Sequence, residues 1–566
     1  MVRGSEGQGV SWVEIVDVSG HSRLKNLGAT RPMNPLTLIQ QAYCVLLLVL
    51  LPPIVAASNL PPANTYLADS NYAMAHGDPA QQDALPQSGP IDRSRSLGPG
   101  DIQYTHTGPA FFGILTSGEY ADGKRVFWGN GLDRIVKLDY DSQAIISEYF
   151  FPDSEIYTQQ RAEESIRAFD ADNDGLFALV HGFREAQKLR SLSKLYTLLD
   201  RDHVYYIGSK TGLITAYGDA DPNNSRSAIV KLREFQLPEN VTGPVMGLSM
   251  TYDGWLIVAT EHGHIAAVSR DFTKHHVIRL NYAEGAENKA TKPTGYGWIR
   301  NGFAIDRRGG IYIASQDLMH KVVWTGQELS SQEKDGAWTA GYLNEWGHGT
   351  GATPSLMGFD EEDQFVVITD GQHQMNVVLF WRNEIPNDWQ RLEGAPSRRI
   401  AGQIKVTMGD PSLTSIQSEQ SVVVAGYGAL VVNNRPRNVP WYLPERAVGL
   451  LAGYLGSNPK HQPYGVQKFE WNPISQRLQE SWVNREVSSP SCVPIVGIGS
   501  DTTYLIGARK NQWTLEALDW TTGENRFHYV IGGQRYNVMY SGTLIDMNGR
   551  IHYGTPWGRV RLMPQL

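Results

Sequence analysis

Acidic and histidine side chains recur at short polar turns from residue 133 onward, each after an apolar, β-rich stretch. Such side chains can transfer protons, because histidine titrates near neutral pH, or their oxygens can bind a hard cation. The turn residues are Asp133, Glu261, His262, His264, Asp317, His320, Asp370, His373, Lys510 and Trp557. Consecutive repeats supply two acid–histidine pairs, which we predict to bind a ligand: Asp317, His320, Asp370 and His373.

Asn301 opens one of the apolar stretches and is the fifth predicted ligand-binding residue. Its amide oxygen and a carboxylate of Asp370 could hold a divalent cation, and calcium is the ion that such oxygen ligands suit. The alternative is that Asn301 bonds to neighbouring backbone, as asparagine does in turns. The sequence establishes no cofactor beyond this calcium hypothesis.

Three residues are candidates for catalysis: Asp370, His373 and His348. His348 lies in a glycine-rich connection, Trp346-GHGTG, and an unperturbed histidine titrates at a pKa of about 6.5, which suits a general base. For His348 the alternative is an ordinary loop side chain without a chemical role.

Two further motifs resemble parts of metal sites. Glu261-His-Gly-His264 has two histidines one residue apart but no third ligand at a diagnostic spacing. Asp170-ADNDG has the first half of a calcium loop, yet its twelfth position is His181 and its flanks predict strands. We therefore interpret both as ordinary hairpin turns.

Repeated β-hairpins are the elements that must position these residues. In each hairpin an apolar stretch leads to an Asp, a polar turn and a second β-rich stretch, and a third and sometimes a fourth strand follow. The clearest copies begin at Ser165, Met246, Asn301, Ser355 and Ser541. Four antiparallel strands in about 40–70 residues, repeated along the chain, are typical of β-propeller blades.

We therefore expect an all-β fold, a single β-propeller of eight four-stranded blades over residues 101–566, with seven blades as the alternative. The repeats start near residues 110, 164, 243, 299, 354, 414, 491 and 540, with insertions at 183–195 and 433–465. The last repeat has three strands, so Asp101–Thr107 should supply its fourth and remove an open sheet edge. In such a ring the turns that carry the acidic and histidine residues surround the channel mouth.

Two stretches resemble known propeller repeats. Leu515-EALDWTTGENRFHYVIGG is similar to the pyrroloquinoline quinone repeat of quinoprotein-like propellers, A-L-D-x-x-T-G-x-x-x-W, although Phe527 and Tyr529 stand where Trp is usual. Asn301-GFAIDRRGGIYIAS resembles the repeat of gluconolactonase-like propellers, in which the matching Asn reaches a cation at the channel mouth. Each resemblance covers about one blade and implies a propeller. Quinoprotein alcohol dehydrogenases carry a vicinal cysteine pair, which this chain lacks.

Composition limits the partners. The 566 residues are 41 % hydrophobic, which is enough for a substantial core, and the formal net charge of −8 argues against nucleic acid. The two cysteines, Cys44 and Cys492, cannot form a disulfide framework. Cys492 has no basic neighbour in the sequence, so we interpret it as a buried, inert thiol.

Residues 1–57 read as a targeting segment. The apolar core Cys44–Leu51 is shorter than the roughly 20 residues that span a bilayer, and Val55-Ala56-Ala57 suits signal peptidase. We interpret it as a cleaved signal peptide; an uncleaved membrane anchor through residues 36–57 and a buried helix are the alternatives. Residues 58–100, rich in Pro, Ser, Asn and Asp, predict a flexible linker.

The sequence thus favours an exported protein, periplasmic or extracellular, or one anchored to the membrane. Its propeller is expected to bind a small molecule or a protein at the channel mouth. The alternative is a propeller enzyme at the same place, either a metal-assisted hydrolase or lactonase, or a quinone-type oxidoreductase.

Overall fold

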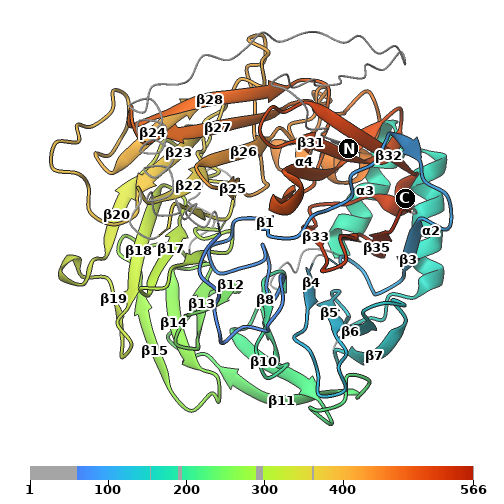
Figure 1. The fold of residues 1–566 in the computed structure, drawn as a ribbon, viewed down its shortest axis with the longest axis horizontal. Helices are drawn as coiled ribbons and strands as arrows, with labels where there is room; N and C mark the ends of the chain where they lie inside the picture. The colour runs from blue at the N-terminus through green and yellow to red at the C-terminus, as the bar shows by residue number, and fades with distance from the viewer. Residues whose placement is uncertain are drawn as a thin grey trace, which may run out of the picture. The chain divides into compact units, whose positions relative to one another are not determined.

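The computed structural model describes residues 60–564 except 112, 153, 189–193, 288–296 and 360–362, and these residues belong to one compact unit, Ser58–Leu566. Eight antiparallel β-sheets follow one another round a ring in this unit, which confirms the predicted eight-bladed propeller (Figure 1). The predicted signal or anchor segment, residues 36–57, lies outside the described residues. In the described part of the chain, no helix has the length and apolar character to span a membrane.

The first four blades take their strands in sequence order. Blade one contains β4 (Gly113–Thr116), β5 (Val126–Asn130), β6 (Arg134–Asp139) and β7 (Ile145–Phe150). Blade two contains β8 (Thr197–Leu199), β9 (Tyr205–Gly208), β10 (Leu213–Asp219) and β11 (Ile229–Gln236). Blade three contains β12 (Val245–Met250), β13 (Trp255–Thr260), β14 (His264–Ser269) and β15 (His275–Arg279). Blade four contains β16 (Ala304–Ile305), β17 (Gly310–Ala314) and β18 (Leu318–Trp324), and its outer position is shared by β19 (Leu329–Ser330) and β20 (Trp338–Gly341).

The next three blades follow the same order. Blade five contains β21 (Ser355–Met357), β22 (Phe365–Thr369), β23 (Asn376–Trp381) and β24 (Ile400–Lys405). Blade six contains β25 (Val423–Ala425), β26 (Gly428–Val432), β27 (Val466–Asn472) and β28 (Arg477–Asn484). Blade seven contains β29 (Ile495–Gly497), β30 (Thr502–Arg509), β31 (Gln512–Asp519) and β32 (Asn525–Gly532), and two short N-terminal strands, β1 (Ala84–Leu85) and β2 (Arg95–Ser96), pair with its two edges.

Blade eight is completed by a strand from the N-terminal side of the propeller. It contains β33 (Thr543–Ile545), β34 (Ile551–Thr555) and β35 (Gly558–Leu562). Its fourth strand is β3 (Ile102–Thr105), which pairs antiparallel with β35. The prediction that Asp101–Thr107 closes the last blade is therefore confirmed, and β3 covers the edge that β35 would otherwise expose.

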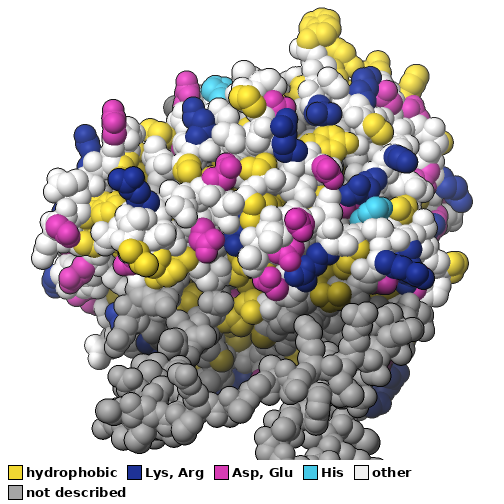
Figure 2. Space-filling model, turned by 45° about the horizontal axis from the view of Figure 1, so that its top comes forward, with side chains coloured by type: hydrophobic (Ala, Val, Ile, Leu, Met, Phe, Trp, Pro, Cys, Tyr) yellow, Lys and Arg dark blue, Asp and Glu magenta, His cyan; other side chains and the backbone are white. Residues whose placement is uncertain are grey.

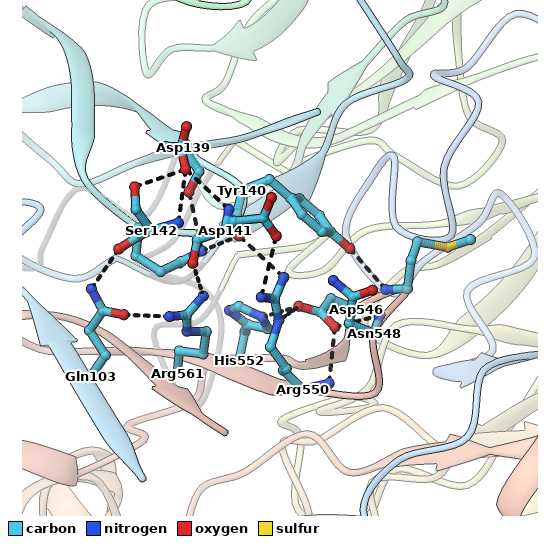
Figure 3. A network of polar contacts seen from close by, with 12 residues as sticks. Gln103, Asp139, Tyr140, Asp141, Ser142, Asp546, Asn548, Arg550, His552 and Arg561 are labelled. Atoms are coloured by element: carbon cyan, nitrogen blue, oxygen red, sulfur yellow. Dashed lines mark hydrogen bonds and ion pairs between the residues drawn. The ribbon is translucent and has the colours of Figure 1, made fainter. Parts of the chain in front are cut away.

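A polar network joins the closing strand to blade one (Figure 3). Gln103 of β3 accepts a hydrogen bond from Arg561 (2.6 Å) and donates one to the backbone carbonyl of Ser142 (2.8 Å). Arg561 also donates to the backbone carbonyl of Asp141 (2.6 Å), and the carboxylate of Asp141 lies 3.5 Å from Arg550. The turn between β6 and β7 is thus held by side chains of blade eight and of β3.

The Asp of the repeated hairpin motif fixes the turn between the first two strands of a blade. Asp306 Oδ1 accepts hydrogen bonds from the backbone N–H groups of Arg308 (2.8 Å) and Gly310 (2.9 Å). Asp546 makes the same two bonds in blade eight, each at 2.9 Å. These Asp residues satisfy turn backbone, which explains why Asp recurs with the hairpins. Because adjacent strands are antiparallel, these turns lie on the face opposite the channel mouth.

In the described part of the chain, three α-helices lie in connections on the channel-mouth face: α2 (Gln159–Ala171) and α3 (Gly175–Lys188) between blades one and two, and α4 (Val448–Leu455) within blade six. Phe169 of α2 stacks on Tyr454 of α4, with ring centroids 5.0 Å apart. Four single-turn 3₁₀ helices complete the described secondary structure: Glu333–Asp335, Glu445–Ala447, Ile498–Ser500 and Gln534–Tyr536.

The hairpin predicted at Ser165, and with it a blade that starts near residue 164, is wrong. This stretch forms α2 and α3, because its buried side chains Ala162, Ile166 and Phe169 recur every three or four residues, the helical period. Blade two begins only at β8, so the insertion predicted at 183–195 is part of a longer one that includes both helices. The insertion predicted at 433–465 is confirmed, since it joins β26 to β27.

Candidate functional site

Residues 64–85, which we call the floor segment, lie across the middle of the ring (Figure 1, blue). They bond to the first strand of every blade. Side-chain amides of Asn64 and Asn71 donate to Met250 O (3.0 Å) and Ile545 O (2.6 Å). The other six bonds run from backbone N–H groups of the strands to backbone carbonyls of the floor segment (2.7–2.9 Å). The donors are Thr116, Leu199, Ile305, Leu356, Val424 and Val496, and their acceptors are, in the same order, Tyr72, Ala73, Pro79, Ala80, Gln82 and Asp83.

The flexible linker predicted at 58–100 is therefore wrong for the floor segment. A linker leaves its backbone polar groups in water, whereas these groups complete the inner strands of the propeller. Side chains such as Leu67, Tyr72, Met74 and Leu85 are also buried. The floor segment is thus a structural part of the propeller.

A cavity of about 660 Å³ lies in the channel between the floor segment and the connections of the channel-mouth face. Most of its wall is apolar and comes from first strands and from the connections above them: Ile114, Leu115, Leu195, Met246, Ile299, Val493, Met539 and Leu544. Ten polar side chains also line it: Tyr72, His76, Tyr196, Glu261, Arg300, Asn301, Thr353, Glu419, Ser421 and Tyr540. We call this space the central cavity.

His76 and Asp83 form a hydrogen-bonded pair on the floor of the central cavity. His76 Nδ1 lies 2.7 Å from Asp83 Oδ2, and the side chains are only 11 % and 1 % exposed. Burial lowers the pKa of His76, but the charge and hydrogen bond of Asp83 outweigh it, so the pKa is raised above its usual value. Asp83 is the one side chain among the described residues that hydrogen-bonds the ring of His76, so Nε2 is the nitrogen open to a bound molecule.

The backbone around this pair is strained. His76, Gln81 and Asp83 have positive φ angles of 62°, 60° and 54°. Such conformations in non-glycine residues cost about 1–3 kcal/mol each, and they persist where the surrounding structure enforces them, often at functional sites. Here the bonds of the floor segment to eight blades supply that enforcement.

The polar rim of the central cavity contains an ion pair and a hydroxyl pair. Arg300 donates to the backbone carbonyl of His348 (2.9 Å) and lies 3.4 Å from a carboxylate oxygen of Glu419. The hydroxyls of Tyr196 and Thr353 are 2.8 Å apart. These contacts hold donors and acceptors in place around the apolar wall, which is the arrangement of sites that orient a small molecule.

Of the predicted ligand-binding residues, Asn301 lines the central cavity, and its amide donates to Thr350 O (3.3 Å). His320 is buried inside β18 between Ser315 and Thr339, and burial lowers its pKa to about 3, so it is a neutral side chain of the sheet. Asp317 is exposed and accepts a hydrogen bond from Asn344 (2.7 Å).

Asp370, His373 and His348 do not line the central cavity. Asp370 is buried in the turn after β22, where both carboxylate oxygens accept bonds from Asn376 (2.8 and 2.6 Å), and burial raises its pKa to about 6. His348 and His373 contact the ring of Trp346, with centroids 4.8 and 4.9 Å from it. Asp370 therefore acts as a turn residue, and the two histidines share an aromatic contact.

The calcium hypothesis stays a prediction. Within the described ranges, no group of three or more His, Cys, Asp or Glu side chains is gathered as a metal site would require. The Asp170–Gly175 motif joins two helices, and Asp174 is paired with Lys460 at 3.2 Å. Cys492 is fully buried, and burial raises its pKa to about 12, which agrees with the inert thiol that we expected.

His76 and Asp83 were not among the residues predicted from the sequence, because they lie in the stretch interpreted as a linker. The order of the residues in this stretch, rather than their overall composition, indicated that part of it is buried. Tyr72-Ala-Met-Ala is a short apolar run immediately before the pair, and Tyr72, Ala73 and Met74 are all at most 5 % exposed.

No family model matches the chain. A protein of Archaeoglobus fulgidus, described as uncharacterized, is 33 % identical over 513 residues, which covers 89 % of each chain. Among solved structures, the quinohemoprotein alcohol dehydrogenase from Comamonas testosteroni is 11 % identical with a TM-score of 0.48, over 89 % of this chain and 83 % of that one. BamB from Moraxella catarrhalis is 10 % identical with a TM-score of 0.43, over 83 % and 99 %.

The chain is a β-propeller, as the resemblance of its repeats implied, and its own eight sheets establish this fold. At such low identity the solved structures transfer neither a cofactor nor an activity to this chain.

Proposed function

The chain belongs to the same family as the uncharacterized Archaeoglobus fulgidus protein, and we propose that its propeller binds a small, mainly apolar molecule with one polar group in the central cavity. The observation that carries this proposal is the central cavity itself. Its volume of about 660 Å³ falls among small-molecule sites, which measure about 300–1,000 Å³.

The chemistry of the wall indicates the kind of ligand. Burial of apolar surface yields about 25 cal/mol per Å², so the aliphatic side chains supply affinity for an apolar body. The polar groups gather at two places, the His76–Asp83 pair on the floor and the Arg300–Glu419 pair at the rim. A ligand with a hydroxyl, amine or carbonyl group can satisfy one of them, which fixes its orientation.

The test is a fluorescence titration with 1-aminoanthracene, a neutral apolar probe whose emission rises in an apolar site. We expect saturable binding at one site per chain. Ala186→Trp should abolish it, because Ala186 of α3 lines the central cavity and a tryptophan would fill it. Arg184→Trp, an exposed position on the same helix, is the matched control and should bind as the parent does. Equal binding by the Ala186→Trp variant would refute the proposal.

Acid–base catalysis on the bound molecule is a second candidate function, favoured by the His76–Asp83 pair. A carboxylate on Nδ1 orients the imidazole and stabilises its protonated form, which leaves Nε2 to take a proton from a ligand hydroxyl or a water molecule. Such a step typically contributes about 10²–10⁴-fold to a rate. The His76–Asp83 pair therefore supplies specific candidate residues for the hypothesis that the propeller is an enzyme.

A further inference from the structure

A second cavity, of about 340 Å³, lies over blade six on the channel-mouth face. Three connections form it: residues 406–422 between blades five and six, the insertion 433–465, and the connection that begins at Arg485 after β28. Its lining includes three arginines, Arg435, Arg437 and Arg485. It shares no lining residue with the central cavity.

Two of these arginines have no direct ion pair in the described part of the chain, although the charge of nearby Asp410 interacts with both of them. Arg435 is paired with Glu445, whose Oε2 lies 3.1 Å from Nη2. Neither Arg437 nor Arg485 has a carboxylate within ion-pair distance among the described residues. The pocket's lining carboxylate is Asp410, and its Oδ1 already accepts bonds from the N–H (3.0 Å) and hydroxyl (2.6 Å) of Ser412.

Both arginines are exposed residues, and each has one contact with a neighbouring group of the pocket. The guanidinium carbon of Arg437 lies over the ring of Tyr464, 4.7 Å from its centroid. The stem of Arg485 packs against Gly409, where a Cβ would lie 3.0 Å from Cδ. The side chain of buried Asn433 accepts from Arg435 N (3.0 Å) and donates to Tyr464 O (3.3 Å), so it joins the two ends of the insertion beneath the pocket.

Other lining groups complete a site for an organic anion. Ser415 lines the pocket, and its buried hydroxyl has no hydrogen-bond partner among the described residues. Met408, Leu413 and Val439 add apolar surface beside the arginines. Guanidinium groups bind carboxylate and phosphate through paired hydrogen bonds, which are stronger than bonds between neutral groups.

We propose that the pocket over blade six binds a small organic anion, with a carboxylate or phosphate group held between Arg437 and Arg485 and its carbon skeleton on Met408, Leu413 and Val439. A polyanion is a poorer occupant. Basic and acidic side chains are mingled over the face shown in Figure 2, and the net charge is −8, whereas nucleic acid needs a continuous basic surface.

The test is isothermal titration calorimetry with inorganic phosphate and, separately, with succinate; the two titrations distinguish the two anion chemistries. We expect saturable binding of at least one of them that weakens as sodium chloride is added. Arg437→Gln and Arg485→Gln should each weaken it about 10- to 100-fold, the size of a charged hydrogen bond, and the double variant should not bind. Arg391→Gln, an exposed arginine outside the pocket, is the matched control.

Two further variants make the result decisive. Arg485→Lys keeps the charge and the fold but loses the paired donors, so it should bind more weakly than the parent. Ala186→Trp blocks the central cavity and should leave anion binding unchanged. No saturable binding of either anion, or equal affinity in the Arg437→Gln and Arg485→Gln variants, would overturn the proposal whether or not the central cavity binds its own ligand.

Discussion

At the scale of single residues, the site depends on one buried pair that a short strained segment holds together. Asp83 raises the pKa of His76 against the effect of burial. The backbone carbonyls of Tyr72, Ala73, Pro79 and Asp83 accept hydrogen bonds from the blades, and these bonds fix the position of the pair. Its chemistry therefore belongs to the fold of the floor segment and not to a mobile loop.

The Asp83→Asn variant should lower the pKa of His76, because the amide removes the negative charge and leaves burial as the dominant influence. A pKa raised in the folded state stabilises the parent at a pH below about 6.5, the unfolded value, and this stabilisation is lost as the pH rises through the folded pKa. The parent should therefore lose more unfolding free energy over that range than His76→Gln does. NMR titration of His76 and urea denaturation at several pH values provide the measurements.

His275→Gln, on the exposed outer strand β15, controls for general effects of histidine replacement. An unchanged pKa of His76 in Asp83→Asn would mean that the pair does not interact in solution as the structure indicates. The same conclusion would follow if the unfolding free energies of the parent and of His76→Gln changed in parallel with pH.

At the scale of elements, the N-terminal part of the propeller has two structural roles. The floor segment bonds to the first strand of every blade, and β3 closes blade eight. Neighbouring blades are otherwise joined two at a time, by packing between their sheets and by polar contacts such as the network between blades eight and one. These N-terminal elements thus connect parts of the ring that no single blade-to-blade contact joins.

Deletion of residues 1–95 should destabilise the protein even though β3 remains. The eight hydrogen bonds to the first strands, of about 0.5–1.5 kcal/mol each, are among those lost; together they amount to roughly 4–12 kcal/mol, which is comparable to the whole stability of a typical domain. Deletion of residues 1–59, all outside the described residues, is the matched control and should melt at the temperature of the full chain. Thermal unfolding and size-exclusion chromatography are the measurements, and equal melting temperatures for both deletions would show that the floor segment is dispensable.

At the scale of the whole molecule, the sequence predicted the architecture better than the site. The repeated hairpins predicted a propeller, and a three-stranded last repeat predicted the closure by β3, because both depend on local patterns. The count of eight is right although one of the eight counted repeats, at Ser165, is helical and the true second blade begins at β8. The helices α2 and α3 were mistaken for a hairpin, since a short apolar stretch around Asp170 fits either period. The predicted export and the targeting segment stay predictions, since residues 36–57 lie outside the described ones.

The central cavity could not be predicted, because it depends on which residues meet across the ring. Asn301 was found through its position at the start of a repeat, and it does line the central cavity. His76 and Asp83 come from a stretch whose composition resembles a linker, and only its bonds to eight distant strands show that it is ordered. Asp370 and His320 looked like ligands, but one caps its own turn and the other is buried within a strand.

The central claim is that the channel of this propeller holds a small apolar molecule above the floor segment. A crystal structure of the protein with 1-aminoanthracene tests this claim most directly. We predict density for one probe molecule in contact with Ile114, Met246 and Met539, with its amino group near His76 or Glu419. Probe density confined to the outer surface, or a channel filled only by ordered water at saturating probe, would contradict the account.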